Sequence, residues 1–152
     1  MLRATAGSRL YIGATPFTSY GLDMMPDLEG VAWTEISAVE ALGRLGAEWQ
    51  AEEIPGMLHP DYSTFVKFGE APATMQVVMG MEDEDPGQQR LLQAAEDQSA
   101  AYPFRLDFSG PSLQPRRRWL ALVLSCNEVF DEANSVMRRA SDLLIVSPII
   151  RT

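Results

Sequence analysis

The feature that most constrains this chain is a period-two alternation of apolar and polar residues that returns in segment after segment. The clearest case is residues 102–108, where aromatic and aliphatic side chains alternate with Arg105 and Asp107. Successive side chains of a strand point to opposite faces, so this pattern predicts one buried and one solvated face. We therefore expect a mainly β protein, either a β-sandwich or a flattened β-barrel.

The same pattern predicts further strands along the chain. They are expected at residues 31–42, 47–53, 73–82, 116–129 and 136–146, after a short apolar start at residues 10–15. Glycine, proline and aspartate predict loops or turns at residues 20–30, 43–46, 110–115 and 130–135. Within residues 116–129, one side is expected to carry Leu120, Leu122, Leu124 and Cys126.

One helix is expected to flank the strands. Asp85 is suited to the N-cap, Pro86 to the first helical position and Gln88 to the far side of a capping box. An apolar stripe follows at Leu91, Leu92 and Ala95 and fades near Ala100. So short a helix is stable only when it packs on a sheet.

A long loop is predicted at residues 54–68, because Pro55, Gly56 and Pro60 break regular structure there. We expect it to continue as an extended arm through Phe68. The apolar residues of this loop are Met57, Leu58, Tyr62 and Phe65. A free loop seldom exposes so many apolar groups, which predicts a segment that is mobile in a monomer and ordered against a neighbour.

Length and composition point to one soluble domain over residues 1–152. The net charge of −9 argues against binding nucleic acid over the whole surface. Cys126 is the one cysteine, which excludes an internal disulfide and favours a buried filler in a reducing compartment. With no signal peptide or membrane-length apolar run in the sequence, we expect a product that stays in the cell that makes it.

The sequence offers no catalytic, cofactor-binding or metal-binding set of residues. His59 is the one histidine and is better explained as a loop residue at a contact surface. The acidic residues 82–85 lack the ligand spacing of a calcium loop and are better explained by the start of the helix. The arginines at 116–118 are expected to be solvated or to pair with an acidic neighbouring subunit. We therefore expect no enzyme and no cofactor.

The chain resembles the tail tube (major tail) proteins of long-tailed siphophages over residues 8–150. The resemblance lies in residues 33–39 with the glycines at 43 and 46, in residues 85–95, and in residues 102–106, with residues 10–12 fitting as well. It implies a structural virion protein of the phage tail, made in the bacterial cytoplasm, whose subunits form hexameric rings that stack into a hollow tube. The implied partners are copies of itself, tape measure and terminator proteins, and DNA that passes through the lumen without specific binding, with no membrane.

Two parts of the chain are predicted to act in such an assembly. On residues 47–53, Glu48, Gln50 and Glu52 share one face, and we expect the opposite face with Trp49 to point to the core. The acidic face then lines the lumen or lies on the outside. The loop with Met57, Leu58, Tyr62 and Phe65 is expected between rings. The alternatives are a small β-sandwich binding or accessory module of a virion, or an enzyme with a barrel pocket.

Overall fold

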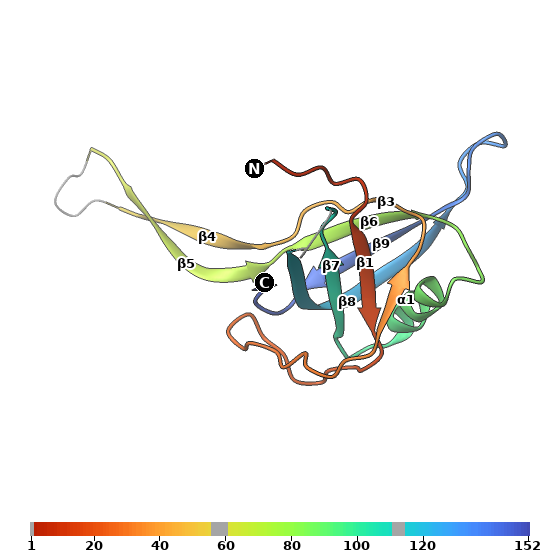
Figure 1. Cartoon of the computed structure of the whole chain (residues 1–152). Coiled ribbons are helices and arrows are strands. Elements are labelled where there is room, and N and C mark those ends of the chain that lie inside the picture. The colour runs from red at the N-terminus through yellow and green to blue at the C-terminus, as the bar shows by residue number, and fades with distance from the viewer. Residues whose placement is uncertain (1, 56–60, 111–114) are drawn as a thin grey trace.

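The computed structural model describes residues 2–55, 61–110 and 115–152 and shows a mainly β fold (Figure 1). An eight-stranded antiparallel sheet forms the body, a two-stranded sheet projects from it, and one helix, α1 (Pro86–Glu96), flanks the body. The prediction of a sandwich-like or flattened barrel-like β fold with one helix is confirmed.

The strands follow one another along the chain with mostly short connections. They are β1 (Arg9–Gly13), β2 (Trp33–Ile36), β3 (Val39–Ala41), β4 (Ala47–Ile54), β5 (Thr64–Pro72), β6 (Thr74–Gly80), β7 (Tyr102–Asp107), β8 (Arg116–Val129), β9 (Arg138–Ile145) and β10 (Ile150–Arg151).

The predicted long strand at residues 31–42 is instead two short strands at opposite edges of the large sheet. The order across the sheet is β2-β1-β7-β8-β9-β6-β3, yet only Ser37 and Ala38 separate β2 from β3. The backbone turns sharply there, with φ of 62° at Ala38. Because two residues join the opposite edges, the sheet must curl until those edges approach each other. This curling gives the body its flattened, barrel-like form.

The main core fills the inner face of the curled sheet. Trp119 and Phe104 stack with 6.1 Å between ring centroids and are fully buried there, and α1 adds Leu91 and Ala94. The helix can pack this closely because Gly87 lies directly against the backbone of β2. Of the predicted stripe, Leu91 packs in the core and Ala95 packs partly against it, whereas Leu92 is not in the core cluster and Ala94 is buried instead.

A second, smaller core lies on the outer face, beneath the loop that precedes β2. Leu28 packs there with Ala101, Leu120 and Val146, and Phe17 forms an antiparallel bridge with Ala101. From the predicted loop, Leu28 and Tyr20 cover one part of the outer face of the sheet, whereas Met24 and Met25 are exposed.

A β-bulge in β8 corrects the predicted single apolar side of that strand. The register with β9 shifts between Val123 and Ser125, so Leu124 has no opposite partner and is exposed. Beyond the bulge the two faces are exchanged. Cys126 therefore packs against the main core, whereas Leu120 and Leu122 belong to the outer cluster.

The last long strand starts later than predicted. β9 begins at Arg138, and Val136 and Met137 lie in the exposed turn that joins it to β8. Alternating residues of β9 are buried, from Arg139 to Ile145.

Candidate assembly surface

The strands β4 and β5 form an arm that leaves the body of the molecule (Figure 1). They pair from Ala47 with Pro72 to Ile54 with Thr64, and no other described strand joins them. The predicted loop at residues 54–68 is therefore shorter than expected, because Thr64 to Phe68 lie in β5. The prediction that the segment continues as an extended arm agrees with the structure.

The arm is continuous with one edge of the body. β5 runs into β6 after one residue, Ala73, whose carbonyl oxygen accepts a hydrogen bond from the amide of Ile145 at 3.0 Å. β9 ends at that point, so the ribbon continues outward without the neighbouring strand. The arm is thus anchored in the sheet at its base and unsupported beyond it.

A β-bulge at Gly69 determines which residues of β5 share a face with the residues of β4. Trp49 pairs with Glu70 and Gln50 pairs with Phe68, which leaves Gly69 as the extra residue of β5, with φ of +57°. Glycine adopts this left-handed backbone without the steric cost that a Cβ would add. A bulge also increases the local twist and bends the strand, which changes the direction of the outer part of the arm.

The predicted acidic face exists, but its opposite face is not buried. Glu48, Gln50 and Glu52 share one face, and their partners on β5 are Ala71, Phe68 and Val66. On the other face Trp49 is 53% exposed, and the ammonium of Lys67 lies 5.2 Å from the Trp49 ring centroid. The prediction that Trp49 points to the core is wrong, because the arm leaves the body and has no core beneath it.

The arm exposes large apolar side chains on both faces. Among the described residues these are Trp49, Ile54, Tyr62, Phe65, Val66 and Phe68. The predicted contact residues Tyr62 and Phe65 are among them, whereas Met57, Leu58 and His59 lie outside the described residues. Val66 and Phe68 were not predicted as contact residues, because residues 54–68 were assigned to a loop and the strand β5 was not recognised. Such clustered apolar exposure is typical of interaction surfaces.

Two grooves flank the base of the arm. One, of about 500 Å³, lies along Arg44, Leu45 and the start of β4 and reaches Pro72. The other, of about 280 Å³, lies between the arm and the C-terminal segment, with Leu22, Ile149 and Arg151 in its lining. Gly46 and Ala47 line both grooves, so the two meet at the point where the arm starts.

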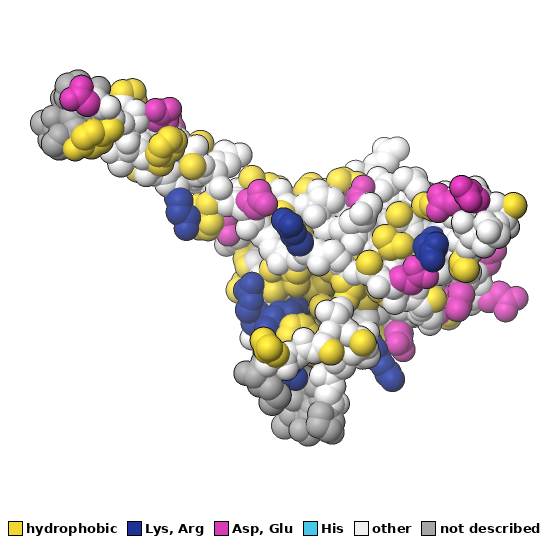
Figure 2. Space-filling model, turned by 90° about the horizontal axis from the view of Figure 1, so that it is seen from above, with side chains coloured by type: hydrophobic (Ala, Val, Ile, Leu, Met, Phe, Trp, Pro, Cys, Tyr) yellow, Lys and Arg dark blue, Asp and Glu magenta, His cyan; other side chains and the backbone are white. Residues whose placement is uncertain are grey.

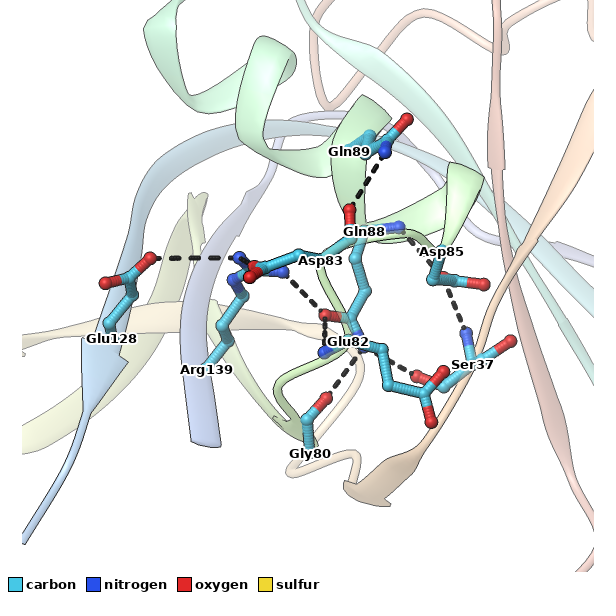
Figure 3. A network of polar contacts seen from close by, with 9 residues as sticks. All are labelled: Ser37, Gly80, Glu82, Asp83, Asp85, Gln88, Gln89, Glu128 and Arg139. Carbon is cyan, nitrogen blue, oxygen red and sulfur yellow. Dashed lines mark hydrogen bonds and ion pairs between the residues drawn. The ribbon is translucent and has the colours of Figure 1, made fainter. Parts of the chain in front are cut away.

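A buried polar network holds the N-terminus of α1 in place (Figure 3). The Asp85 carboxylate accepts hydrogen bonds from the amides of Gln88 at 3.0 Å and Ser37 at 3.1 Å, which confirms Asp85 as the N-cap. The predicted capping box is only half formed. The Gln88 amide nitrogen donates instead to the carbonyl oxygens of Ser37 at 3.0 Å and Gly80 at 2.8 Å. Gln88 thus joins the helix to the link between β2 and β3 and to the end of β6.

The cationic member of this network is Arg139 of β9, which is almost fully buried (Figure 3). It lies 2.6 Å from a carboxylate oxygen of Asp83 and 3.8 Å from one of Glu128. Sequence patterns did not indicate it, because Arg139 and Ser141 occupy inward positions of β9 next to the apolar Leu143 and Ile145. The acidic run at residues 82–85 therefore neutralises a buried arginine as well as capping the helix.

The arginines at 116–118 find partners within the chain. Arg116 pairs with Asp107 at 3.5 Å, Arg118 with Glu29 at 3.8 Å, and Arg117 stacks over Phe108 at 4.6 Å.

Burial raises the pKa of the Cys126 thiol above its usual range, with Glu128 adding to the rise and Arg139 opposing it. In the part of the chain that the structure describes, no group of acidic, histidine or cysteine side chains is arranged to hold a metal ion. Nor does any described helix have the length and apolar composition to cross a membrane.

Comparison with known proteins finds likeness in structure alone. No protein-family model matches the sequence, and no curated protein sequence matches it. A chain of the PVC sheath/tube terminator, from an extracellular contractile injection system in the extended state, is 9% identical with a TM-score of 0.68, over 100% of this chain and 97% of that one.

Two further solved structures are similar over the same span. A chain of the PVC sheath-tube complex in the extended state is 8% identical, with a TM-score of 0.69 over 99% of this chain and 91% of that one. A chain of the anti-feeding prophage cap, described as a tube terminating cap, is 8% identical, with a TM-score of 0.65 over 100% and 91% of the two chains. The fold is therefore shared with these chains from end to end.

Proposed function

We propose that this chain is a structural subunit of a phage-tail-like tube, in which residues 1–152 act as one unit and carry no enzymatic activity. The fold supports a role in such particles, because it matches chains from contractile injection system tubes and terminators over the whole length. The siphophage assignment suggested by the sequence is broadened accordingly, since the similar structures belong to contractile systems.

The observation that carries the proposal is the β4–β5 arm. An unsupported ribbon that exposes Trp49, Phe65 and Phe68 is costly in a monomer, because roughly 25 cal/mol is gained for each Å² of apolar surface removed from water. A neighbouring subunit that covers the arm recovers this free energy. Tyr62 and Phe65 near the outer end of the arm, with Met57 and Leu58, are then contacts between rings.

The strand edges support closure into a ring. The edge strands of the body, β2 and β3, are short and approach each other, so the open edges among the described strands are those of β4 and β5 in the arm. Open edges pair readily with other chains, and a head-to-tail contact that closes forms a ring. Rings of six that stack into a tube are the arrangement implied by the family resemblance.

The face of β4 that carries Glu48, Gln50 and Glu52 is proposed to line the channel of that tube. Fixed negative charge repels phosphate, so DNA or another acidic cargo passes without binding. Tape measure and terminator proteins are the proposed further partners. Particles would assemble in the bacterial cytoplasm and carry the subunit in their tails.

A second candidate is a subunit that ends the tube rather than extends it. Two of the similar structures come from a sheath/tube terminator and from a tube terminating cap. A terminator and a tube subunit differ in how far they stack, because a terminator forms one ring on an existing tube, whereas a tube subunit adds ring upon ring.

Negative-stain electron microscopy of the concentrated pure protein tests the proposal. Stacked rings or tubes support the tube subunit, and single rings support the terminator. The variant Phe65→Ser with Phe68→Ser removes apolar surface from both faces of the arm, and it should keep the circular dichroism of the wild type but lose assembly. A wild-type protein that stays monomeric at the highest attainable concentration contradicts the proposal.

A further inference from the structure

The two ends of the body carry opposite charge along its longest strand. β8 has 14 residues, which corresponds to roughly 45 Å of extended chain. It begins with three consecutive arginines at 116–118 and ends beside Glu128, shortly before Asp131 and Glu132. Arg116 and Arg118 pair with Asp107 and Glu29, so the cations without an ion pair near this end, within the described residues, are Arg117, Arg151 and Arg44, whereas carboxylates without an ion pair gather at the opposite end.

The negative end is here called the acidic tip and comprises residues 130–137, between β8 and β9, with the adjoining residues 81–85. The two segments are joined by a hydrogen bond of 3.0 Å from the amide of Met81 to the carbonyl oxygen of Met137. In Figure 1 the turn between β8 and β9 projects on the side of the body opposite to the β4–β5 arm.

Apolar side chains and unpaired carboxylates lie together on the acidic tip. Phe130, Val136 and Met137 are each more than half exposed. Within the acidic tip, the carboxylates that form no ion pair with a described residue are Glu82, Glu84, Asp85, Asp131 and Glu132, of which Asp85 accepts backbone hydrogen bonds as the N-cap of α1. An exposed apolar group ringed by charge is typical of a protein contact surface.

The positive end offers a surface of matching character, here called the basic base. It comprises the 280 Å³ groove beside the arm, with apolar lining from Leu22, Pro148 and Ile149, and the exposed cations Arg44 and Arg151. Neither cation forms an ion pair within the described residues. Figure 2 shows dark blue side chains near the base of the arm, with magenta ones beside them, and more of the magenta on the far side of the body.

We infer that the acidic tip of one copy docks on the basic base of a second copy, with Phe130, Val136 and Met137 entering the groove beside the arm. Asp131 and Glu132 then face Arg44 and Arg151. Glu70 in the groove lining repels carboxylates and so limits how closely Asp131 and Glu132 can approach the groove. The contact joins opposite ends of the same sheet, so it is heterologous and repeats without closing. This inference rests on the proposed function and names the contact by which one ring stacks on the next.

A charge exchange between the two ends tests the inference. Arg44→Glu with Arg151→Glu, and separately Asp131→Arg with Glu132→Arg, should each raise the concentration needed for stacking by about tenfold or more, since like charges then meet. The four substitutions combined should restore stacking, because each pair again faces its opposite. All four side chains are exposed, so circular dichroism should match the wild type, and the thermal midpoint should fall slightly only in variants that place arginine at 131, where φ is 52°. Arg44→Lys with Arg151→Lys keeps the charge and serves as the control.

The outcomes separate this inference from the proposed function. Stacking that is lost in both reversed variants and regained in the combined variant supports the tip-to-base contact. Wild-type-like stacking of the reversed variants, or failure of the combination to restore it, overturns the contact and leaves the tube proposal standing. A wild-type protein that forms no assembly overturns both.

Discussion

The side-chain oxygen of Gln88 accepts a hydrogen bond of 2.8 Å from Nη1 of Arg139, and both side chains are almost completely buried. This bond links the first turn of α1 to β9, a strand that lies 51 residues further along the chain. The side-chain nitrogen of Gln88 also donates to the backbone of Ser37, in the link that joins the two edge strands, and of Gly80 at the end of β6. One amide therefore connects the helix, this link, β6 and a buried cation.

Replacing Gln88 by alanine should destabilise the fold by about 2–4 kcal/mol. The substitution leaves the carbonyl oxygens of Ser37 and Gly80 without their donor and removes a neutral partner of buried Arg139. Urea denaturation followed by fluorescence measures the change. Gln89→Ala is the matched control. The Gln89 side chain is exposed, so its removal should lower the free energy of unfolding by less than about 0.5 kcal/mol. Equal effects of the two substitutions would contradict the role assigned to Gln88.

Gly87→Ala should shift or detach the start of α1, at a cost of at least about 2 kcal/mol. A Cβ at this position would overlap the backbone of Glu35 and Ile36, and backbone cannot move aside as a flexible side chain can. Gly80→Ala is the control, because a Cβ there would lie 3.5 Å from Ala38, an ordinary contact. Thermal unfolding compares the two variants, and a Gly87 variant as stable as the Gly80 variant would show that the helix is not held this tightly.

The sequence predicted the elements of the body well where one face is buried. The alternations at 73–82 and 102–108 became β6 and β7, and Asp85 capped α1 as expected. It failed where long-range geometry decides. Ala38 takes a left-handed turn that splits residues 31–42 between two sheet edges, and no local pattern marks it.

The arm shows a different limit of sequence patterns. Alternation at residues 47–53 indicates that Trp49 and Glu48 lie on opposite faces of the strand. It does not indicate whether a core exists beneath either face. That depends on where β9 ends, which is set by the Ser147-Pro148 turn far along the chain. The Gly69 bulge likewise hid the alternation of β5, because the extra residue shifts its period.

The two tryptophans Trp49 and Trp119 should behave oppositely on truncation. Trp119→Ala should cost about 3–5 kcal/mol of stability, because that side chain is fully buried in the main core. Trp49→Ala should change stability by less than about 1 kcal/mol, since the ring is half exposed on the arm, but should impair assembly. Chemical denaturation and sedimentation velocity report the two properties separately. A large loss of stability for Trp49→Ala would contradict an unsupported arm.

Alkylation of Cys126 should be slow in the folded protein and fast in the unfolded one. Burial raises the pKa of this thiol, so at a given pH less thiolate is present than in the unfolded chain. The rate with iodoacetamide should therefore rise only at a higher pH than it does in urea. Mass spectrometry follows the modification over time, and identical pH profiles in the two states would show that the thiol is not shielded.

Whether the acidic face of β4 lines a channel can be tested by comparing charge reversals on the two faces of the strand. If Glu48 and Glu52 line a channel, Glu48→Lys with Glu52→Lys should permit assembly but retain acidic cargo, because each reversal replaces a repelling group by an attracting one. Intact particles with low delivery are the expected result. An amine reagent too large to enter the channel should leave these lysines unmodified in assembled tubes. Glu53→Lys is the matched control on the other face of β4, opposite Phe65, and it should deliver normally. Rapid labelling of the lysines at 48 and 52 from outside an intact tube would place this face on the exterior.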